Sequence, residues 1–335
     1  MKRRITAVLI VLCMVALALT GCSGTAKKQV RTPRPDGLPK DYPNKTIEIC
    51  HGFGAGSMTE SFVRLVMDNI KEKEGWDNGF TIGFHEGGSG AIGWTYTASA
   101  KPDGYTLGIV QGTSMIRPIS ENEQGWGLDK FSYICNMMTS PGAIAVAADS
   151  KYQTLTDLID DAKANPGKVT IALGGLTSSD GLACRQVEMA TGVEFNKIPA
   201  GDEESAPMVL GGFADAAWLN EDDFAAYLET GQMRLLATGD DQRSPFSPDV
   251  PTYKECGVDV KQANFRSICG PAGMDPVMVQ YLQDCWVNAM NDPDLQKAAE
   301  SLKVPYQIRG SAETYELYKA WSETLQALWD KEPWQ

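Results

Sequence analysis

The alternation of apolar and polar positions divides the chain into short strands and amphipathic helices. Apolar runs at residues 47–51, 80–84 and 105–110 have the length and period of β-strands. An apolar stripe predicts a helix over residues 58–73, and small residues favour another over 91–100. The order strand–helix–strand–helix–strand, with short loops, predicts a parallel sheet with right-handed crossovers.

The same pattern starts again near residue 149. We expect strands at 169–173, 195–198, 214–219 and 231–238, and helices at 155–164, 182–191 and around 206–210. We expect the chain after Pro276 to be helical to its end. Two similar α/β segments in series predict an α/β fold of two lobes with a cleft between them.

The first residues have the pattern of an export signal. Lys2, Arg3 and Arg4 precede an apolar run over residues 5–19, which is too short to cross ~30 Å of hydrocarbon comfortably. The sequence Leu-Thr-Gly-Cys at 19–22 then resembles a bacterial lipobox. We expect residues 1–21 to be a lipoprotein signal peptide and Cys22 to carry the lipid, the alternative being a plain secretory signal with an incidental cysteine.

The segment over residues 22–43 is polar and basic, and it contains Pro33, Pro35, Pro39 and Pro43. Such a composition is typical of an extended tether. A lipid followed by a tether predicts a protein held at the outer face of the cytoplasmic membrane, in the periplasm or its equivalent.

Three glycine-rich loops follow predicted strands. They read HGFGAGSMTESF (51–62), EGGSGAIG (86–93) and GGLTSSDG (174–181). A dinucleotide fingerprint needs G-x-G-x-x-G, and in the first loop the third glycine comes one position early. The chain also has no Gly-Lys-Ser/Thr, so a nucleotide site is disfavoured.

Two interpretations of the loops remain. Ser57 and Glu60 fit the S-x-x-E capping box, in which Ser57 accepts from the amide of Glu60 and Glu60 reaches back to the amide of Ser57. Alternatively, backbone amides and helix amino-termini from both lobes hold a small carboxylate-bearing molecule. A helix terminus contributes only ~0.3–1 kcal/mol, so micromolar affinity, about −8 kcal/mol, also needs several charge-assisted bonds from a closed cleft.

Composition excludes some classes of function. The chain has 335 residues, enough for about two domains, and a formal net charge of −13. No basic stripe is present, so nucleic acid is not an expected partner. Six cysteines follow Cys22 at scattered spacing without a C-x-x-C motif, and we expect mostly free thiols, no metal site and no cofactor.

The sequence as a whole resembles the extracytoplasmic solute-binding subunits of tripartite tricarboxylate transporters, also called Bug proteins. The resemblance runs from about Thr46 to Tyr318. Its landmarks are GAGSMTESFVR, GGSGAIG, KPDGYTLGIV, TLTDLIDDAKANPGKVTIALGG, LGGFADAAW, RSPFSPDVPTYKECG and FRSICGPAGM. The AKANPGK and SPDVPT matches are the most specific.

The resemblance implies a type II periplasmic-binding-protein fold, with residues 44–148 and 264–335 in the first lobe and 149–263 in the second. It also implies a small carboxylate-bearing solute, a di- or tricarboxylate or an amino acid, passed by a monomer to a large and a small membrane subunit. The ligand-binding residues carried over are Ala55, Gly56, Ser57, Met58, Thr59, Glu60, Gly87, Gly88, Ser89, Gly90, Thr177, Ser178, Ser179, Asp180, Ala200 and Gly201.

This chain departs from the family at several of these positions. Glu60 stands where the family usually has Asp, Asp180 where it often has His, and Ala200 where a Tyr is frequent. Glu203 and Glu204 add further acids. One hypothesis is therefore a ligand with one carboxylate and an amino group; the other is that the glutamates face solvent and Asp180 caps a helix.

Two further functions are conceivable. A hydrolase would need Ser178 or Cys184 beside His51 or His85, although no G-x-S-x-G or Cys-His signature is present. A sensory protein that presents its ligand to a membrane kinase would differ from a transporter subunit only in its partner. We expect a binding protein rather than an enzyme, with both histidines structural and Trp94 and Trp218 in the core.

Overall fold

The computed structural model describes residues 31–87, 90–112, 127–176 and 178–331. Within these residues the strands pair in the order β2-β1-β3-β9-β4-β7-β5-β6, and β8 and β10 also pair with β4. We name the strands on the β1 side of β4 the β1 half of the sheet, and those on its other side the β5 half.

The β1 half begins with the predicted βαβ units. It contains β1 (Ile47–His51), β2 (Phe80–Phe84), β3 (Thr106–Gln111), β9 (Ala263–Pro271) and β10 (Tyr306–Arg309). β1 pairs in parallel with both β2 and β3, which confirms the parallel arrangement expected from the sequence. β9 then runs antiparallel to β3.

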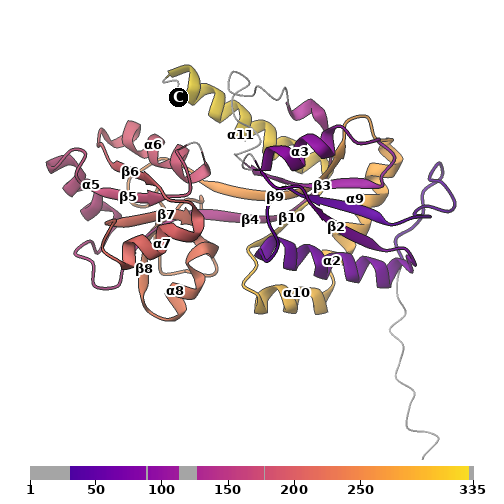
Figure 1. Ribbon diagram of the computed structural model, residues 1–335, viewed down its shortest axis with the longest axis horizontal. Helices are drawn as coiled ribbons and strands as arrows, with labels where there is room; N and C mark the ends of the chain where they lie inside the picture. The colour runs from indigo at the N-terminus through magenta and orange to yellow at the C-terminus, as the bar shows by residue number, and fades with distance from the viewer. Residues whose placement is uncertain (1–30, 88–89, 113–126, 177, 332–335) are drawn as a thin grey trace, which may run out of the picture. The chain divides into compact units, whose positions relative to one another are not determined.

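β4 (Phe131–Ala147) is a strand of 17 residues that belongs to both halves. Residues 131–141 pair antiparallel with β9, and residues 142–147 pair with β7 and β8 (Figure 1). Most of its side chains are buried, so it has no apolar–polar alternation for sequence analysis to detect. We name β4 and its partner β9 the crossing strands.

The β5 half repeats the α/β pattern. It contains β5 (Thr170–Leu173), β6 (Asn196–Pro199), β7 (Ala216–Asn220) and β8 (Met233–Thr238). β5 pairs in parallel with β6 and β7, whereas β7 and β8 run antiparallel to β4. Each strand lies within a few residues of its predicted position.

Several helices start at a side chain that caps the first turn. Ser57, Thr154, Ser178, Asp275 and Asp292 each accept a backbone N–H at a helix start, which satisfies donors that the first turn leaves unpaired. The α-helices are α2 (Met58–Glu74), α3 (Ala91–Ala98), α5 (Leu155–Ala164), α6 (Ser179–Thr191), α7 (Asp202–Leu210), α8 (Ala225–Glu229), α9 (Pro276–Met290), α10 (Pro293–Ser301) and α11 (Ser311–Lys331), with 3₁₀ turns η3 (Leu128–Lys130) and η4 (Glu221–Phe224).

Separate apolar cores form on the two halves. Ile49, Phe62 and Trp286 are buried in the β1 half, and Leu158 and Trp218 in the β5 half. Trp94 is also buried, in a third cluster. Trp94 and Trp218 therefore both pack in the interior, as expected from the sequence.

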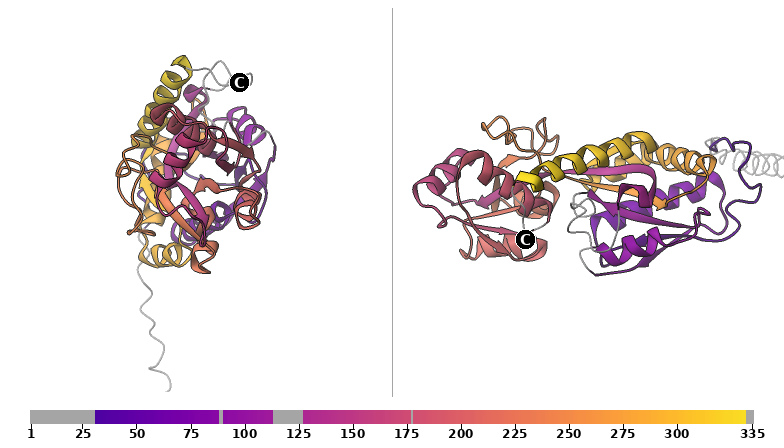
Figure 2. Two further views of the ribbon diagram at one scale, coloured as in Figure 1. Left: turned by 90° about the vertical axis from the view of Figure 1, so that its left-hand side faces the viewer. Right: turned by 90° about the horizontal axis from the view of Figure 1, so that it is seen from above.

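The third cluster joins α11 to the crossing strands. Tyr318 on α11 packs against Phe265 on β9, with ring centroids 4.7 Å apart, and its hydroxyl donates to the carbonyl of Val110. Leu182 on α6 belongs to the same buried cluster. Figure 2 shows α11 lying beside β4, in agreement with their contacts.

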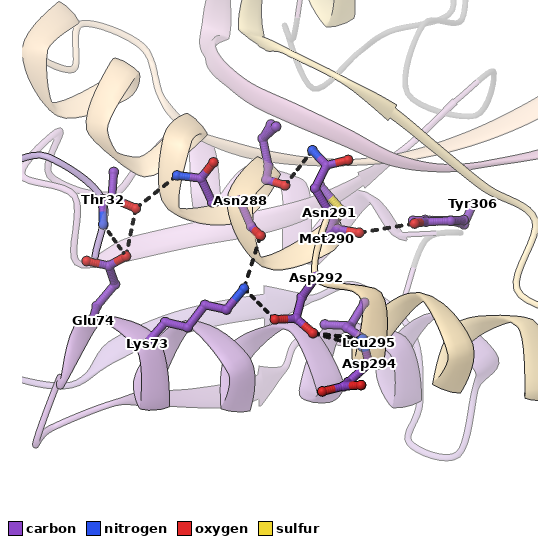
Figure 3. Close-up of polar contacts among 11 residues, drawn as sticks. Thr32, Lys73, Glu74, Asn288, Met290, Asn291, Asp292, Asp294, Leu295 and Tyr306 are labelled. Carbon is purple, nitrogen blue, oxygen red and sulfur yellow. Dashed lines mark hydrogen bonds and ion pairs between the residues drawn. The ribbon is translucent and has the colours of Figure 1, made fainter. Parts of the chain in front are cut away.

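The segment from Thr32 to Tyr42 is bound to the β1 half, which differs from the extended tether expected over 22–43. The backbone N–H and hydroxyl of Thr32 both donate to Glu74 Oε1, at 2.9 and 2.7 Å, and Asn288 donates to the Thr32 hydroxyl (Figure 3). Leu38 and Tyr42 are buried in the core. Two apolar residues among prolines form no periodic pattern, so the sequence did not indicate this packing.

Candidate functional site

The loop between β1 and α2 is held by Ser57 and Glu60. Ser57 Oγ accepts from the amide of Glu60 at 3.1 Å, as the capping-box interpretation requires. The reciprocal bond is different: Glu60 Oε2 accepts from the amide of Gly56 at 2.7 Å, not from Ser57. Glu60 Oε1 also accepts from Arg64 Nε at 2.8 Å. The Gly56 amide, and then Arg64, lower the pKa of Glu60, so this carboxylate stays charged and fixes the loop.

The other predicted residues of this loop differ in exposure. Ala55 and Gly56 are exposed, Ser57 and Met58 are half-buried, and Thr59 and Glu60 are buried. Met58 packs against the apolar core of the β1 half. Ala55, Gly56 and Ser57 therefore form the accessible part of the predicted set.

The second loop touches the first through backbone atoms. A β-carbon on Gly52 would lie 2.9 Å from the carbonyl oxygen of Gly90, and one on Gly93 would lie 2.6 Å from Gly52 Cα. Gly87 is exposed, and Gly90 is buried with φ of 95°. Two loops that the sequence only placed at neighbouring strand ends are thus packed together, and glycine allows this approach. The predicted residues 88 and 89 lie outside the described part of the chain.

The two predicted loops of the β5 half also lie together. Asp180 Oδ2 accepts from the amide of Gly174 at 2.5 Å. A β-carbon on Gly174 would lie 2.1 Å from Asp202 Oδ1, so the start of α7 contacts this loop as well. Ser178 caps α6, and Asp180 lies inside its first turn rather than at the cap. The predicted residue 177 is not among the described residues.

Burial changes the titration of Asp180. Its side chain is only 4% exposed, and burial raises its pKa to about 6. Ser179 beside it is buried too, whereas Ser178, Ala200 and Gly201 are half-buried. α7 begins at Asp202, four residues before the predicted helix, and this places Glu203 and Glu204 on its exposed first turn.

Arg266 on β9 is a candidate that sequence reasoning missed. The guanidinium is buried, with 7% of the residue exposed. Nη1 donates to Ser140 Oγ, Nη2 lies 3.4 Å from Asp222 Oδ2, and no described residue accepts a hydrogen bond from Nε. The available signal was an arginine within the apolar run FRSICG, since a buried arginine needs acceptors from elsewhere in the chain.

Arg266 lies within electrostatic reach of both pairs of loops. Burial is the main cause that lowers the pKa of His51, and the charge of Arg266 is a smaller cause in the same direction. The same charge opposes the rise in pKa that desolvation causes at Asp202 and Asp223. His51 ends β1, Asp202 starts α7 and Asp223 belongs to η4. The charge of Arg266 therefore acts on groups from both the β1 half and the β5 half.

Several carboxyl groups surround this one cation. Desolvation, and next the charge of Asp222, raise the pKa of Asp223. The pKa of Asp202 is also raised by desolvation, even though its side chain is solvent-accessible. One arginine cannot neutralise three neighbouring carboxylates, so protons or a ligand must balance the remaining charge.

A cavity of about 190 Å³ adjoins Asp222, the carboxylate partner of Arg266. Asp222 and Glu221 contribute to its wall, and Ala225, Leu228 and Phe246 supply apolar surface. Glu221 is buried and bonded to Ser247, and burial raises its pKa. Polar groups at the edge of an apolar cavity are usual for a small-molecule site.

The groups needed for a hydrolase are not brought together. His51 Nδ1 contacts the backbone of Phe53, and burial lowers the pKa of His51. His85 stacks on Tyr96 and lies 3.4 Å from a carboxylate oxygen of Glu48. Ser178 Oγ donates to the Gly175 carbonyl, and burial raises the pKa of Cys184 well above its usual value, so neither is an activated nucleophile.

Two kinds of feature are absent from the described residues. No helix among them combines the length and apolar character needed to cross a membrane. Over the same part of the chain, no three residues of the types His, Cys, Asp and Glu form a group that could bind a metal ion.

Comparison with known proteins gives a consistent set of relatives. Residues 55–320 match the model of the tripartite tricarboxylate transporter family receptor, TctC. The UPF0065 protein in the gbd 5' region of Cupriavidus necator is 31% identical over 292 residues, covering 85% of this chain and 88% of that protein. Protein BugT of Bordetella pertussis is 27% identical over 284 residues, covering 80% and 85%.

Solved structures share the fold. A TctC solute-binding protein from Polaromonas, without ligand, superposes with a TM-score of 0.74 at 26% identity, covering 87% of this chain and 99% of that one. Rpa4515 of R. palustris, solved with adipate, has a TM-score of 0.74 at 21% identity, covering 87% and 98%. The fold is therefore that of the periplasmic solute-binding proteins, as expected from the sequence.

Proposed function

The chain belongs to the tripartite tricarboxylate transporter family of receptors, of the Bug type, and we propose that it captures a small carboxylate-bearing solute for delivery to membrane permease subunits. It is a solute-binding receptor and not an enzyme. The adipate bound by Rpa4515 supports a carboxylate as the ligand class for this chain. The proposal also covers the ligand-binding residues, the identity of the solute and the membrane partners.

The observation that carries the proposal is the packing of the glycine loops in pairs. Gly52 and Gly90 meet in the β1 half, and Gly174 and Asp202 meet in the β5 half. Backbone amides in such loops, next to the starts of α2, α3, α6 and α7, can donate to a carboxylate. The proposed ligand-binding residues are those carried over from the family, and the two lobes proposed remain residues 44–148 with 264–335 and residues 149–263.

A binding titration tests this function. Isothermal titration of the full chain in detergent with acetate, succinate, adipate, citrate and L-aspartate, the carboxylate panel, should give saturable heat for at least one member. A ligand present at 100 times its dissociation constant should also stabilise the protein by about 2.7 kcal/mol in a thermal melt. Absence of binding across the panel, with turnover of an ester or amide substrate instead, would contradict the proposal.

We also propose that Cys22 carries a lipid and that the mature protein is a monomer at the outer face of the membrane. The support is the lipobox at residues 19–22, which lies outside the described residues, and the family of receptors. Cys22→Ser should move the protein from the membrane fraction to the supernatant of spheroplasts. Co-purification of the unaltered protein with a large and a small membrane subunit would support the transport partners, whereas capture of a membrane kinase would favour a sensory role.

A further inference from the structure

Arg266 is a buried cation whose hydrogen bonds are incomplete. Its fork has five N–H donors. Within the described residues Nη1 has the Ser140 hydroxyl, Nη2 has only the 3.4 Å contact to Asp222, and Nε has no acceptor. A strong guanidinium–carboxylate bond is ~2.7–2.9 Å long and often paired. The contact with Asp222 is longer than this, and it uses a single nitrogen.

The hydrogen bonds of Asp222 are incomplete as well. Its side chain is 9% exposed, the same fraction as that of Arg266, and its Oδ1 accepts no hydrogen bond from any residue that the structure describes. The carboxylate therefore holds the arginine with one oxygen and leaves the other unused. Both partners are buried and unsatisfied, and Asp222 lines a cavity, which is the arrangement expected when a third group completes the site.

We propose that one carboxylate of the solute binds the Arg266 guanidinium through Nε and Nη2, and that Asp222 then accepts from a cationic N–H group of the same solute. This inference rests on the proposed function and specifies its ligand as a molecule with an ammonium group close to a carboxylate. It assigns Arg266 and Asp222 as residues that determine specificity.

The charges around the pair determine which solutes fit. Asp202 and Asp223 lie close enough to Arg266 to interact with its charge, and Asp222 is in contact with it. A second carboxylate at this end of the ligand would face these acids and be repelled. An ammonium group would instead be attracted by them, so L-aspartate should bind better than succinate, which has the same carbon skeleton without the amine.

Variants of the full chain separate the roles of the two residues. Arg266→Gln removes the charge, Arg266→Lys keeps the charge but not the planar fork, and Asp222→Asn removes the acid with little change in shape. Arg234→Gln is the matched control, because Arg234 is a half-buried arginine that donates to the carbonyls of Ala148, Ser150 and Tyr152. Circular dichroism and thermal melts establish that each variant is folded.

Titration of the wild type and each variant with succinate and with L-aspartate gives the two dissociation constants to be compared. Arg266→Gln should weaken binding roughly 10- to 100-fold, the loss of charge-assisted hydrogen bonds, and Arg266→Lys should weaken it less. Asp222→Asn should reduce the preference for L-aspartate over succinate at least several-fold. A merely structural role would weaken both probes equally and leave this ratio unchanged.

Failure of this inference can be distinguished from failure of the proposed function. If the wild-type chain binds a member of the carboxylate panel and folded Arg266→Gln or Arg266→Lys binds it equally well, the inference is wrong while the function stands. An unchanged ratio in Asp222→Asn overturns the assignment of that residue. If no member of the panel binds the wild-type chain, the proposed function fails, and this inference fails with it.

Discussion

Gly52 and Gly90 touch through their backbones, so closely that a β-carbon on Gly52 would lie 2.9 Å from the Gly90 carbonyl oxygen and 3.0 Å from its Cα. The nearest atoms belong to the main chain and cannot move aside as a side chain can. This contact joins the loop that follows β1 to the loop that follows β2, and it fixes the place where their amides are presented.

Gly52→Ala should therefore separate the two loops. We expect a loss of roughly 1–3 kcal/mol in the free energy of unfolding, the usual cost of an overpacked position. Urea unfolding followed by circular dichroism measures it. Gly175→Ala is the control, because a β-carbon there meets its nearest atoms only at 3.7 Å or beyond. Equal stability of both variants would show that the loops do not depend on this contact.

Asp180→Asn should stabilise the protein above pH 6. The pKa of Asp180 is about 6 in the fold and ~3.9 in the unfolded chain, so the folded state binds more protons between these values. Stability is therefore lost as the pH rises through this window. At pH 8 the variant should gain on the order of 2–3 kcal/mol over the wild type, while the amide oxygen still accepts from Gly174. At pH 3.5 the two proteins should be equally stable.

Asp157→Asn is the control of opposite sign. Two backbone amides donate to Asp157 Oδ2 at 2.9 Å and lower the pKa of this carboxyl. Its contribution to stability is thus present above the unfolded pKa and lost as the pH falls. The variant should be less stable than the wild type at pH 7, and the difference should shrink toward pH 3. Parallel pH curves for the two variants would contradict both assignments.

Glu74→Ala should release the segment from Thr32 to Tyr42. The substitution removes the acceptor of two Thr32 donors and leaves a buried N–H unpaired, at a cost of about 1–3 kcal/mol. Hydrogen exchange at residues 32–42 should become faster, and trypsin should cleave faster after Lys40, which Asp41 follows. Asp68→Ala, at an exposed position of the same helix, should change neither. Unaltered exchange in Glu74→Ala would mean that Leu38 and Tyr42 hold the segment unaided.

Among the six cysteines that the structure describes, native thiol labelling should be confined to Cys256. Cys50, Cys135, Cys184, Cys269 and Cys285 are free and buried, whereas Cys256 is half-buried. Burial also raises the pKa of Cys256, so little thiolate forms at pH 7 and its reaction with a disulfide reagent should be slow. Quantitative labelling of the folded protein with an aromatic disulfide reagent, followed by peptide mapping, provides the check. Rapid modification of any of the five buried thiols would indicate local opening of the core.

The local pattern by itself determined the strands and helices that have a clear period. The sequence predicted β1 and β2 with the bounds that the structure gives, and α5 over Leu155–Ala164 likewise. The capping role of Ser57 was predicted too. These features depend on neighbouring residues, since helix caps and side-chain periodicity act over one to four positions along the chain.

Tertiary structure decided the features that join distant residues. Thr32 and Glu74 are 42 positions apart, and Arg266 and Asp222 are 44 apart, so no local period relates them. The partner of Glu60 is Gly56 and not Ser57, because the loop turns its amide toward the carboxylate. A strand buried along most of its length, such as β4, carries an apolar run without alternation. Pairing across the chain depends on the whole fold, because only the folded backbone places these groups within hydrogen-bond reach.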